Sequence, residues 1–295
     1  MTGPATARRL ESGKRGRFGS PPPTAWPWFS GLWLDQRVRF WGRRNPVDGT
    51  VDVRPLLAAA ERGDDDDAAS LYDRLCHQGT TTATSYTALP ELFSSALRCK
   101  PAPYIAPLFL AADILAATDR PAGIDVTRLR RTYAADILKL EALTVRCLNL
   151  PALHGDLSSF IYLMQVLLAL QDEPTWSHHL TGLAGGEYEL LCPTCGRDLY
   201  AVIDPDIAVI TEGYTPAEQQ QRTSIDPADP PRAGDAAAER LHRLALDHDQ
   251  PQVAAMIAAL FGLGTCPECR ARFSVADTVT ADPQPVCTPT FSRTT

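Results

Sequence analysis

Two Cys-Pro-x-Cys pairs constrain this chain more than any other feature of its sequence. The first pair is Cys192-Pro193-Thr194-Cys195, the second is Cys266-Pro267-Glu268-Cys269, and residues 196–265 separate them. Four thiolates arranged in two such pairs can close one tetrahedral metal site. Because a closed site leaves no open position for a substrate, the pattern predicts that Cys192, Cys195, Cys266 and Cys269 bind one structural zinc ion.

The separation between the pairs exceeds the roughly 15–20 residues that are usual for such sites. Lengthening a closed loop from ~18 to ~70 residues costs only about 1.2 kcal/mol. Structural zinc binding contributes roughly 10–16 kcal/mol in zinc-finger peptides. The long insert is therefore compatible with one shared site.

Redox chemistry is the main alternative for these cysteines. In thioredoxin- and glutaredoxin-like enzymes the first Cys lies at a helix N-terminus, which lowers its pKa. Here strand-like sequences, 198–202 and 272–275, follow the two pairs instead. In this β context the two pairs resemble those of a rubredoxin-like zinc ribbon, and the resemblance covers only these two short stretches. An iron centre and unligated thiols also stay open as alternatives.

The composition indicates a globular chain without a membrane span. Hydrophobic residues make up 44% and charged residues 21% of the sequence, and eight cysteines are too few for a disulfide scaffold. The most apolar run, 160–170, is too short to cross a bilayer. We therefore expect a cytoplasmic protein whose thiols stay reduced and available for metal.

The first 49 residues differ from the rest in charge and aromatic content. Residues 1–44 hold nine Lys and Arg against Glu11 and Asp35, although the whole chain has a net charge of −7, and residues 26–44 contain four of the five tryptophans. We expect residues 1–49 to be a disordered basic and aromatic extension. Alternatives are a segment on a membrane surface or nucleic acid, a docked helix, or an over-long gene prediction.

From Val51 onward, apolar spacing predicts a helical body. The segment 157–171 is apolar nearly all round, which predicts a central position among the helices, and Asp156 is its predicted N-cap. The spacing also indicates that Pro90 and Pro107 lie inside helices, where proline causes a kink. The predicted helices are 53–62, 68–78, 81–98, 101–118, 125–148 and 157–171.

The helical body resembles the HEAT-repeat class of α-solenoids of GC-rich bacteria. The segments that carry the resemblance are 71–79 and the Leu89-Pro90-x-Leu92 pattern, within roughly residues 50–180. No clean period of about 40 residues repeats. The resemblance implies an array of helical hairpins that binds partners rather than a catalyst.

The C-terminal part mixes short strands with helices. We predict strands at 187–191, 198–203 and 207–210, a polar linker at 215–234, and helices at 235–247 and 252–263. The predicted fold class is mainly α, with a HEAT-like domain (50–185), a split zinc-ribbon module with a helical insert (186–278) and a flexible tail (279–295). Residues 182–186, rich in glycine, are predicted to form a loop.

Other candidate ligands carry weaker signals. The run Asp64–Asp67 is better explained as a solvated helix N-terminus, and Cys76-His77 as adjacent helical residues that face different ways. His178-His179 is interpreted as a solvent-facing helix end, and His242 and His248 are poorly spaced for shared ligation. The sequence shows no Gly-rich phosphate loop, Gly-x-Ser-x-Gly or His-Glu-x-x-His motif.

Together these features favour a non-enzymatic binding or scaffold protein with one structural zinc ion. Its expected partner is another protein, and the zinc module would cover the apolar end of the helical array. A transcription-related, nucleic-acid-binding zinc-ribbon protein is the alternative, although the acidic body disfavours broad contact with phosphates. A thiol redox protein is a third hypothesis.

Overall fold

The computed structural model describes residues 52–61, 65–77, 80–212, 221–228 and 236–281. Helices account for 59% of the described residues, and the C-terminal part adds a small antiparallel sheet and a cluster of four cysteines. The mainly helical fold class is thereby confirmed. The HEAT-like arrangement and the domain boundaries stay predictions. The predicted extension, residues 1–49, lies outside the described residues.

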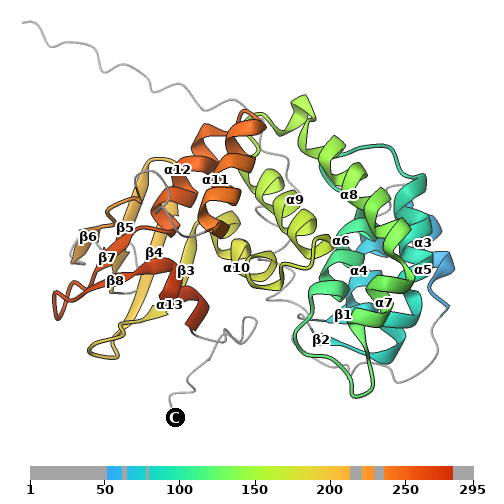
Figure 1. The fold of residues 1–295 in the computed structure, drawn as a ribbon, viewed down its shortest axis with the longest axis horizontal. Helices are drawn as coiled ribbons and strands as arrows, with labels where there is room; N and C mark the ends of the chain where they lie inside the picture. Colours follow the sequence, from blue (N-terminus) through green and yellow to red (C-terminus); the bar gives the residue numbers. More distant parts are fainter. Residues whose placement is uncertain (1–51, 62–64, 78–79, 213–220, 229–235, 282–295) are drawn as a thin grey trace, which may run out of the picture. The chain divides into compact units, whose positions relative to one another are not determined.

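The N-terminal part consists of helices and one minimal β-ribbon (Figure 1). Helix α9 contacts α6, α8 and α10, and nearly all of its side chains are buried, so its predicted central position is confirmed. The elements are α3 (Arg54–Glu61), α4 (Asp65–Leu75), β1 (Cys76–His77), β2 (Thr80–Thr81), α5 (Ala83–Arg98), α6 (Ala106–Ala116), α7 (Val126–Thr132), α8 (Ala134–Leu148), the 3-10 turn η1 (Pro151–Leu153), α9 (Leu157–Leu170) and α10 (Pro174–Gly185).

Side chains close both ends of the central helix α9. At its N-terminus the Asp156 carboxylate accepts a hydrogen bond from the Ser159 N–H at 3.1 Å, as predicted. At its C-terminus the Arg130 guanidinium, from α7, donates to the carbonyls of Leu170 (2.9 Å) and Ala169 (2.5 Å). The Ala169 carbonyl also accepts from the Asp172 N–H at 3.4 Å, and the bonds from Arg130 cap this end of the helix and tie α7 to α9.

Two predictions in the first helices are wrong. Helix α4 ends at Leu75, and Cys76 and His77 instead pair with Thr81 and Thr80 as a β-ribbon. Where the helix ends, the Leu75 carbonyl accepts a hydrogen bond from the Ser85 hydroxyl at 2.5 Å.

Pro90 does lie inside α5, but Pro107 lies in the first turn of α6. Helix α6 begins five residues later than predicted, at Ala106. A proline in a first turn removes no helical hydrogen bond, so it causes no kink there.

Helix α10 corrects the prediction of a loop at residues 182–186. The helix includes residues up to Gly185 and ends on Gly186, which is left-handed with a φ of 79°. Gly182 serves packing rather than a turn: a Cβ atom there would lie 2.3 Å from the Tyr188 ring. Periodicity cannot distinguish such a packing glycine from a loop glycine.

The C-terminal part contains a four-stranded antiparallel sheet in the order β3-β4-β5-β6 and a separate β7–β8 hairpin. The three predicted strands and both insert helices are confirmed, with ends shifted by up to three residues. The elements are β3 (Glu187–Leu191), β4 (Asp198–Asp204), β5 (Ile207–Thr211), β6 (Arg222–Ser224), α11 (Ala236–Asp247), α12 (Pro251–Leu260), β7 (Leu263–Thr265), β8 (Arg272–Ser274) and α13 (Val275–Ala281).

Within two segments expected to lack regular structure, the described residues form regular elements. In the predicted linker 215–234 these are β6, the buried Ile225, and Asp226, which forms a β-bridge with Leu263. Helix α13 extends into the predicted tail as far as Ala281, and the rest of the tail lies outside the described residues. These elements contact residues far away in the sequence, and local composition does not report such contacts.

One buried apolar cluster runs from the helical part into the C-terminal part. The insert helices pair with each other, and α12 also contacts α9, α10 and β4. The rings of Trp176 in α10 and Phe261 after α12 have centroids 4.7 Å apart. In Figure 1, α9 and α10 lie between the earlier helices and the strands. No helix among the described residues is long and apolar enough to cross a membrane.

Candidate metal centre

The sulfur atoms of the four predicted ligands lie together. Their Sγ atoms are all within 4.8 Å of one another, although the two pairs are far apart in sequence. Cys192 Sγ is 3.7 Å from Cys269 Sγ, and Cys195 Sγ is 3.9 Å from Cys266 Sγ. The four cysteines are therefore close enough to hold one metal ion, whose identity the geometry leaves open.

The first pair lies in the loop between strands β3 and β4. The Cys192 N–H donates to the carbonyl of Arg197 at 2.8 Å, and the Gly196 N–H donates to the carbonyl of Cys192 at 2.9 Å. Gly196 has a φ of 68°, in the left-handed region. These bonds close a tight turn with both sulfurs on one side.

The second pair lies between β7 and β8 and repeats the same turn. The Cys266 N–H donates to the carbonyl of Ala271 at 2.9 Å, and the Arg270 N–H donates to the carbonyl of Cys266 at 3.0 Å. Arg270 occupies the left-handed position, with a φ of 62°. The two loops thus have one backbone design, with Gly in the first and Arg in the second at the left-handed position.

Backbone donors point at the sulfur atoms. Burial of the Cys192 thiol favours its neutral form, but the N–H groups of Cys195 and Thr194 donate to its sulfur and lower its pKa to about 7. In the second loop, burial raises the pKa of Cys266, while the N–H groups of Cys269 and Glu268 act against that rise. Such N–H groups stabilise thiolate, which is the form that binds metal.

The first cysteine of each pair is buried and the second is exposed. Cys192 and Cys266 are almost inaccessible, whereas Cys195 and Cys269 lie at the surface. The site therefore sits at the edge of the core, with one side open to solvent.

The donor set and its spacing fit a tetrahedral ion with sulfur ligands. Zn–S bonds of about 2.3 Å at tetrahedral angles place neighbouring sulfurs roughly 3.8 Å apart. The two measured separations, 3.7 and 3.9 Å, bracket this value. Both separations greatly exceed the roughly 2.05 Å of a disulfide bond. The residues present therefore fit a closed four-thiolate site.

Residues that sequence reasoning missed bring the second loop to the first. Asp226 and Leu263 exchange two backbone hydrogen bonds of 2.9 Å, and the Thr223 hydroxyl donates to the Thr265 carbonyl. The ion pair between Arg197 and Glu268 joins the two loops at 3.5 Å. The available signal was the pair of β-branched residues Thr223 and Ile225 inside the predicted linker.

The weaker sequence candidates do not join this or another site. Among the described residues, the four cysteines form the only group of three or more potential ligands within mutual reach. His178 and His179 lie within α10 rather than at its end, and burial lowers the pKa of both. His248 Nδ1 is 3.1 Å from Asn149 Oδ1. The side chains of residues 64–67 and of His77 lie outside the described part.

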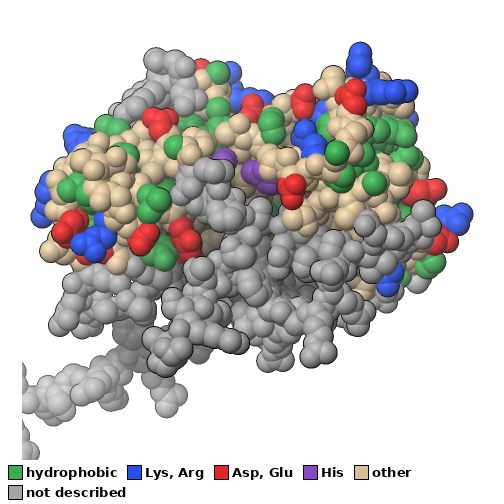
Figure 2. Space-filling view, turned by 90° about the horizontal axis from the view of Figure 1, so that it is seen from below, with side chains coloured by type: hydrophobic (Ala, Val, Ile, Leu, Met, Phe, Trp, Pro, Cys, Tyr) green, Lys and Arg blue, Asp and Glu red, His purple; other side chains and the backbone are tan. Residues whose placement is uncertain are grey.

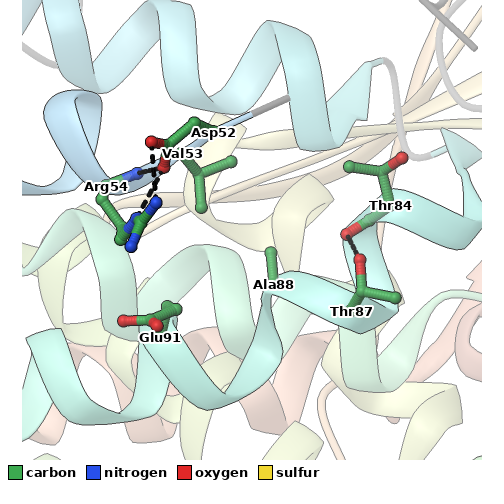
Figure 3. Close-up of a pocket in the computed structure, with 7 residues that line it drawn as sticks. All are labelled: Asp52, Val53, Arg54, Thr84, Thr87, Ala88 and Glu91. Atoms are coloured by element: carbon green, nitrogen blue, oxygen red, sulfur yellow. Dashed lines mark hydrogen bonds and ion pairs between the residues drawn. The ribbon is translucent and has the colours of Figure 1, made fainter. Parts of the chain in front are cut away.

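A small surface pocket lies between the start of α3 and the helix α5 (Figure 3). Asp52 and Arg54 lie side by side on one side of it, and the guanidinium donates to the carboxylate at 2.8 and 3.0 Å. These two charged groups are thus already paired with each other. The residues that line it are Asp52, Val53, Arg54, Thr84, Thr87, Ala88 and Glu91.

Comparisons of the chain with protein-family models, curated protein sequences and solved structures found no significant match. The resemblances to HEAT-like solenoids and to zinc ribbons thus rest on the residues quoted for them. The function is argued from the cysteine cluster and the surfaces around it.

Proposed function

We propose that this protein is a non-catalytic binding scaffold whose C-terminal module is held together by one Zn²⁺ ion on Cys192, Cys195, Cys266 and Cys269. The observation that carries the proposal is the set of four sulfurs within 4.8 Å of one another. Four thiolates complete a tetrahedral shell, so no position remains for a water molecule or substrate. The ion would act by joining two loops separated by 70 residues of sequence.

Zinc is favoured over redox use of the thiols by the structure around each pair. The loops connect β-strands, β3 to β4 and β7 to β8. A reactive Cys-x-x-Cys pair instead has its first cysteine at a helix N-terminus, where the dipole stabilises the thiolate. Iron binds the same donor set, and its colour in visible absorption would reveal it.

The helical part supports a role in protein binding. Its apolar residues form one core, yet α8 keeps Leu138 and Val145 exposed, at 65% and 40% of their full accessibility. The resemblance to HEAT-like arrays implies the same role. Leu138 and Val145 are seven residues apart, about two helical turns, so they point to the same side of α8, where a partner could cover both.

Metal analysis of the purified chain tests the proposal. We expect one zinc per chain, no visible absorption from iron, and loss of the metal when all four cysteines are replaced by serine. Because metal that binds only the folded state stabilises it, the quadruple variant should also unfold at a lower temperature. Unchanged zinc content and thermal stability in that variant would refute the metal assignment. Measured turnover without any captured partner would refute the scaffold role.

A further inference from the structure

The sheet β3-β4-β5 has one face in the core and one face toward solvent. Tyr188, Leu190 and Leu199 are buried on the core face. Since side chains alternate along a strand, their neighbours in sequence point to the opposite side. We call this solvent side of β3, β4 and β5 the outer face.

Apolar side chains form a strip along the outer face. Val202 in β4 lies directly opposite Val209 in β5, and both are half-buried. Ile207 and Leu191, at opposite ends of the strip, are exposed at 46% and 48%. Tyr200, half-buried, lies between Val202 and the end of the sheet that carries the first cysteine pair. The strip thus presents an aromatic ring and aliphatic side chains to solvent.

Four carboxylates flank this strip. Glu187 and Glu189 are on β3, and Asp198 and Asp204 are on β4. The pKa of Glu187 is raised by partial burial and then by the nearby charges of Glu189 and Asp204, which shows that these carboxylates crowd together. The sheet side of the molecule, on the left in Figure 2, carries acidic, basic and hydrophobic side chains, and the strand register decides which of them belong to the outer face.

Basic side chains are scarce on the outer face. Strands β3, β4 and β5 contain no Lys or Arg. Within the described sheet, the register places one basic residue on this side, Arg222 of the edge strand β6, opposite Thr211. The face therefore has a clear negative charge around an apolar centre.

The charge of this face selects the chemistry of its occupant. Aromatic sheet faces that bind nucleic acid need surrounding positive charge, so four carboxylates disfavour that ligand here. Arginine complements the face better, because its guanidinium stacks on a tyrosine ring and binds carboxylates in a bidentate manner. Aliphatic side chains of the occupant would cover the strip between Val202 and Ile207.

We propose that the outer face is a docking surface for an extended segment of a partner protein in which arginine and aliphatic residues take turns at every second position. This inference rests on the proposed binding function and names the chemistry of the partner. Every second side chain of an extended segment points to the same side, so arginines there would meet the carboxylates of β3 and β4 while aliphatic residues lie on the strip.

Fluorescence anisotropy of the full-length chain with labelled octapeptides tests this proposal. Serine occupies every second position of each probe, and the positions between alternate arginine with valine, arginine with serine, or glutamate with valine. We expect the arginine–valine peptide to bind most tightly and the glutamate–valine peptide not to bind. A variant with Glu187→Gln, Glu189→Gln, Asp198→Asn and Asp204→Asn should weaken arginine–valine binding about tenfold or more, since each exposed ion pair contributes modestly and four are removed.

The matched control neutralises four carboxylates away from the sheet: Glu91→Gln, Asp119→Asn, Glu141→Gln and Asp247→Asn. It changes the net charge equally and should alter the affinity less than about threefold. A second variant, Val202→Ser with Ile207→Ser, should reduce arginine–valine binding to the level of the arginine–serine peptide. Zinc content and circular dichroism report whether each variant is folded.

Three results would overturn the proposal: equal loss of affinity in the face variant and the control, no binding of the arginine–valine peptide, or competition by a single-stranded oligothymidine. None of these is the result that refutes the proposed function. That function fails if the chain lacks zinc and captures no partner. A partner that the face variant still captures would refute only the location and chemistry proposed for docking.

Discussion

The two cysteine loops have the same backbone hydrogen bonds but different support. The first loop joins β3 and β4, strands of five and seven residues inside a four-stranded sheet. The second joins β7 and β8, of three residues each, and reaches the sheet mainly through the bridge between Asp226 and Leu263. The comparison suggests that the first loop is formed by its sheet, whereas the second depends on the metal and on a few contacts.

Removal of the metal should lower the stability of the chain more than any other change, and it should affect the second cysteine loop more than the first. We expect the variant Cys195→Ser with Cys269→Ser to lose zinc and several kcal/mol of stability, because structural zinc contributes roughly 10–16 kcal/mol in small domains. Hydrogen exchange should then accelerate strongly in 263–274 and much less in 187–211. Cys99→Ser, outside the site, serves as the control. Equal acceleration in both loops would contradict the proposed difference.

Disrupting the contact between β7 and the sheet should cause the second-largest loss of stability. A Cβ atom on Gly262 would lie 2.4 Å from the Asp226 carbonyl oxygen, so Gly262→Ala must displace backbone. We expect a loss of about 2 kcal/mol in urea unfolding, the usual cost of overpacking. Gly185→Ala has open space around the added atom and should be neutral or slightly stabilising. A neutral Gly262→Ala would show that the bridge is dispensable.

Substitutions at the left-handed positions of the two loops should change the free energy of unfolding with opposite signs. Gly196 has a φ of 68° and no atom within 4 Å of an added Cβ, so Gly196→Ala should cost about 1 kcal/mol from backbone strain alone. Arg270 already has this strain at a φ of 62°, so Arg270→Gly should stabilise by about 0.5 kcal/mol. Arg270→Ala removes the charge but keeps the backbone strain, so it distinguishes the effect of charge from the effect of strain. Thermal unfolding of the zinc-loaded chain measures all three.

The ion pair between the loops should have the smallest effect. Arg197 and Glu268 are 3.5 Å apart and each is about half exposed, at 54%. A double-mutant cycle with Arg197→Gln and Glu268→Gln should give a coupling of about 0.2–1 kcal/mol that shrinks in high salt. A coupling several times larger would mean that this pair, and not the metal, aligns the two loops.

Short-range patterns predicted the local structure of this chain well. Asp156 was recognised as an N-cap, and the strands that flank the first cysteine pair were placed within a residue of their ends. The four cysteines that the spacing grouped together do lie together. Each of these features depends on residues close in sequence, or on a motif that repeats.

Two of the failures involve tertiary contacts, and a third involves the position of a helix end. The short strand β6 exists because β5 pairs with it, and Gly182 lies in a helix because Tyr188 packs against it. Pro107 looked like an interior residue because periodicity locates helices better than it locates their ends. None of these partners could be read from the local sequence.

The sequence by itself determined the helical character of the helices from α3 to α9 and the grouping of the four thiols, because periodicity and motif spacing are local properties. Only the tertiary structure decided how the second loop reaches the first, which cysteines are buried, and that Arg270 adopts a left-handed conformation. It also revealed the acidic outer face, since Glu187, Glu189, Asp198 and Asp204 come together only through strand register. Register and packing arise from contacts between distant residues, and those contacts form only when the whole chain folds.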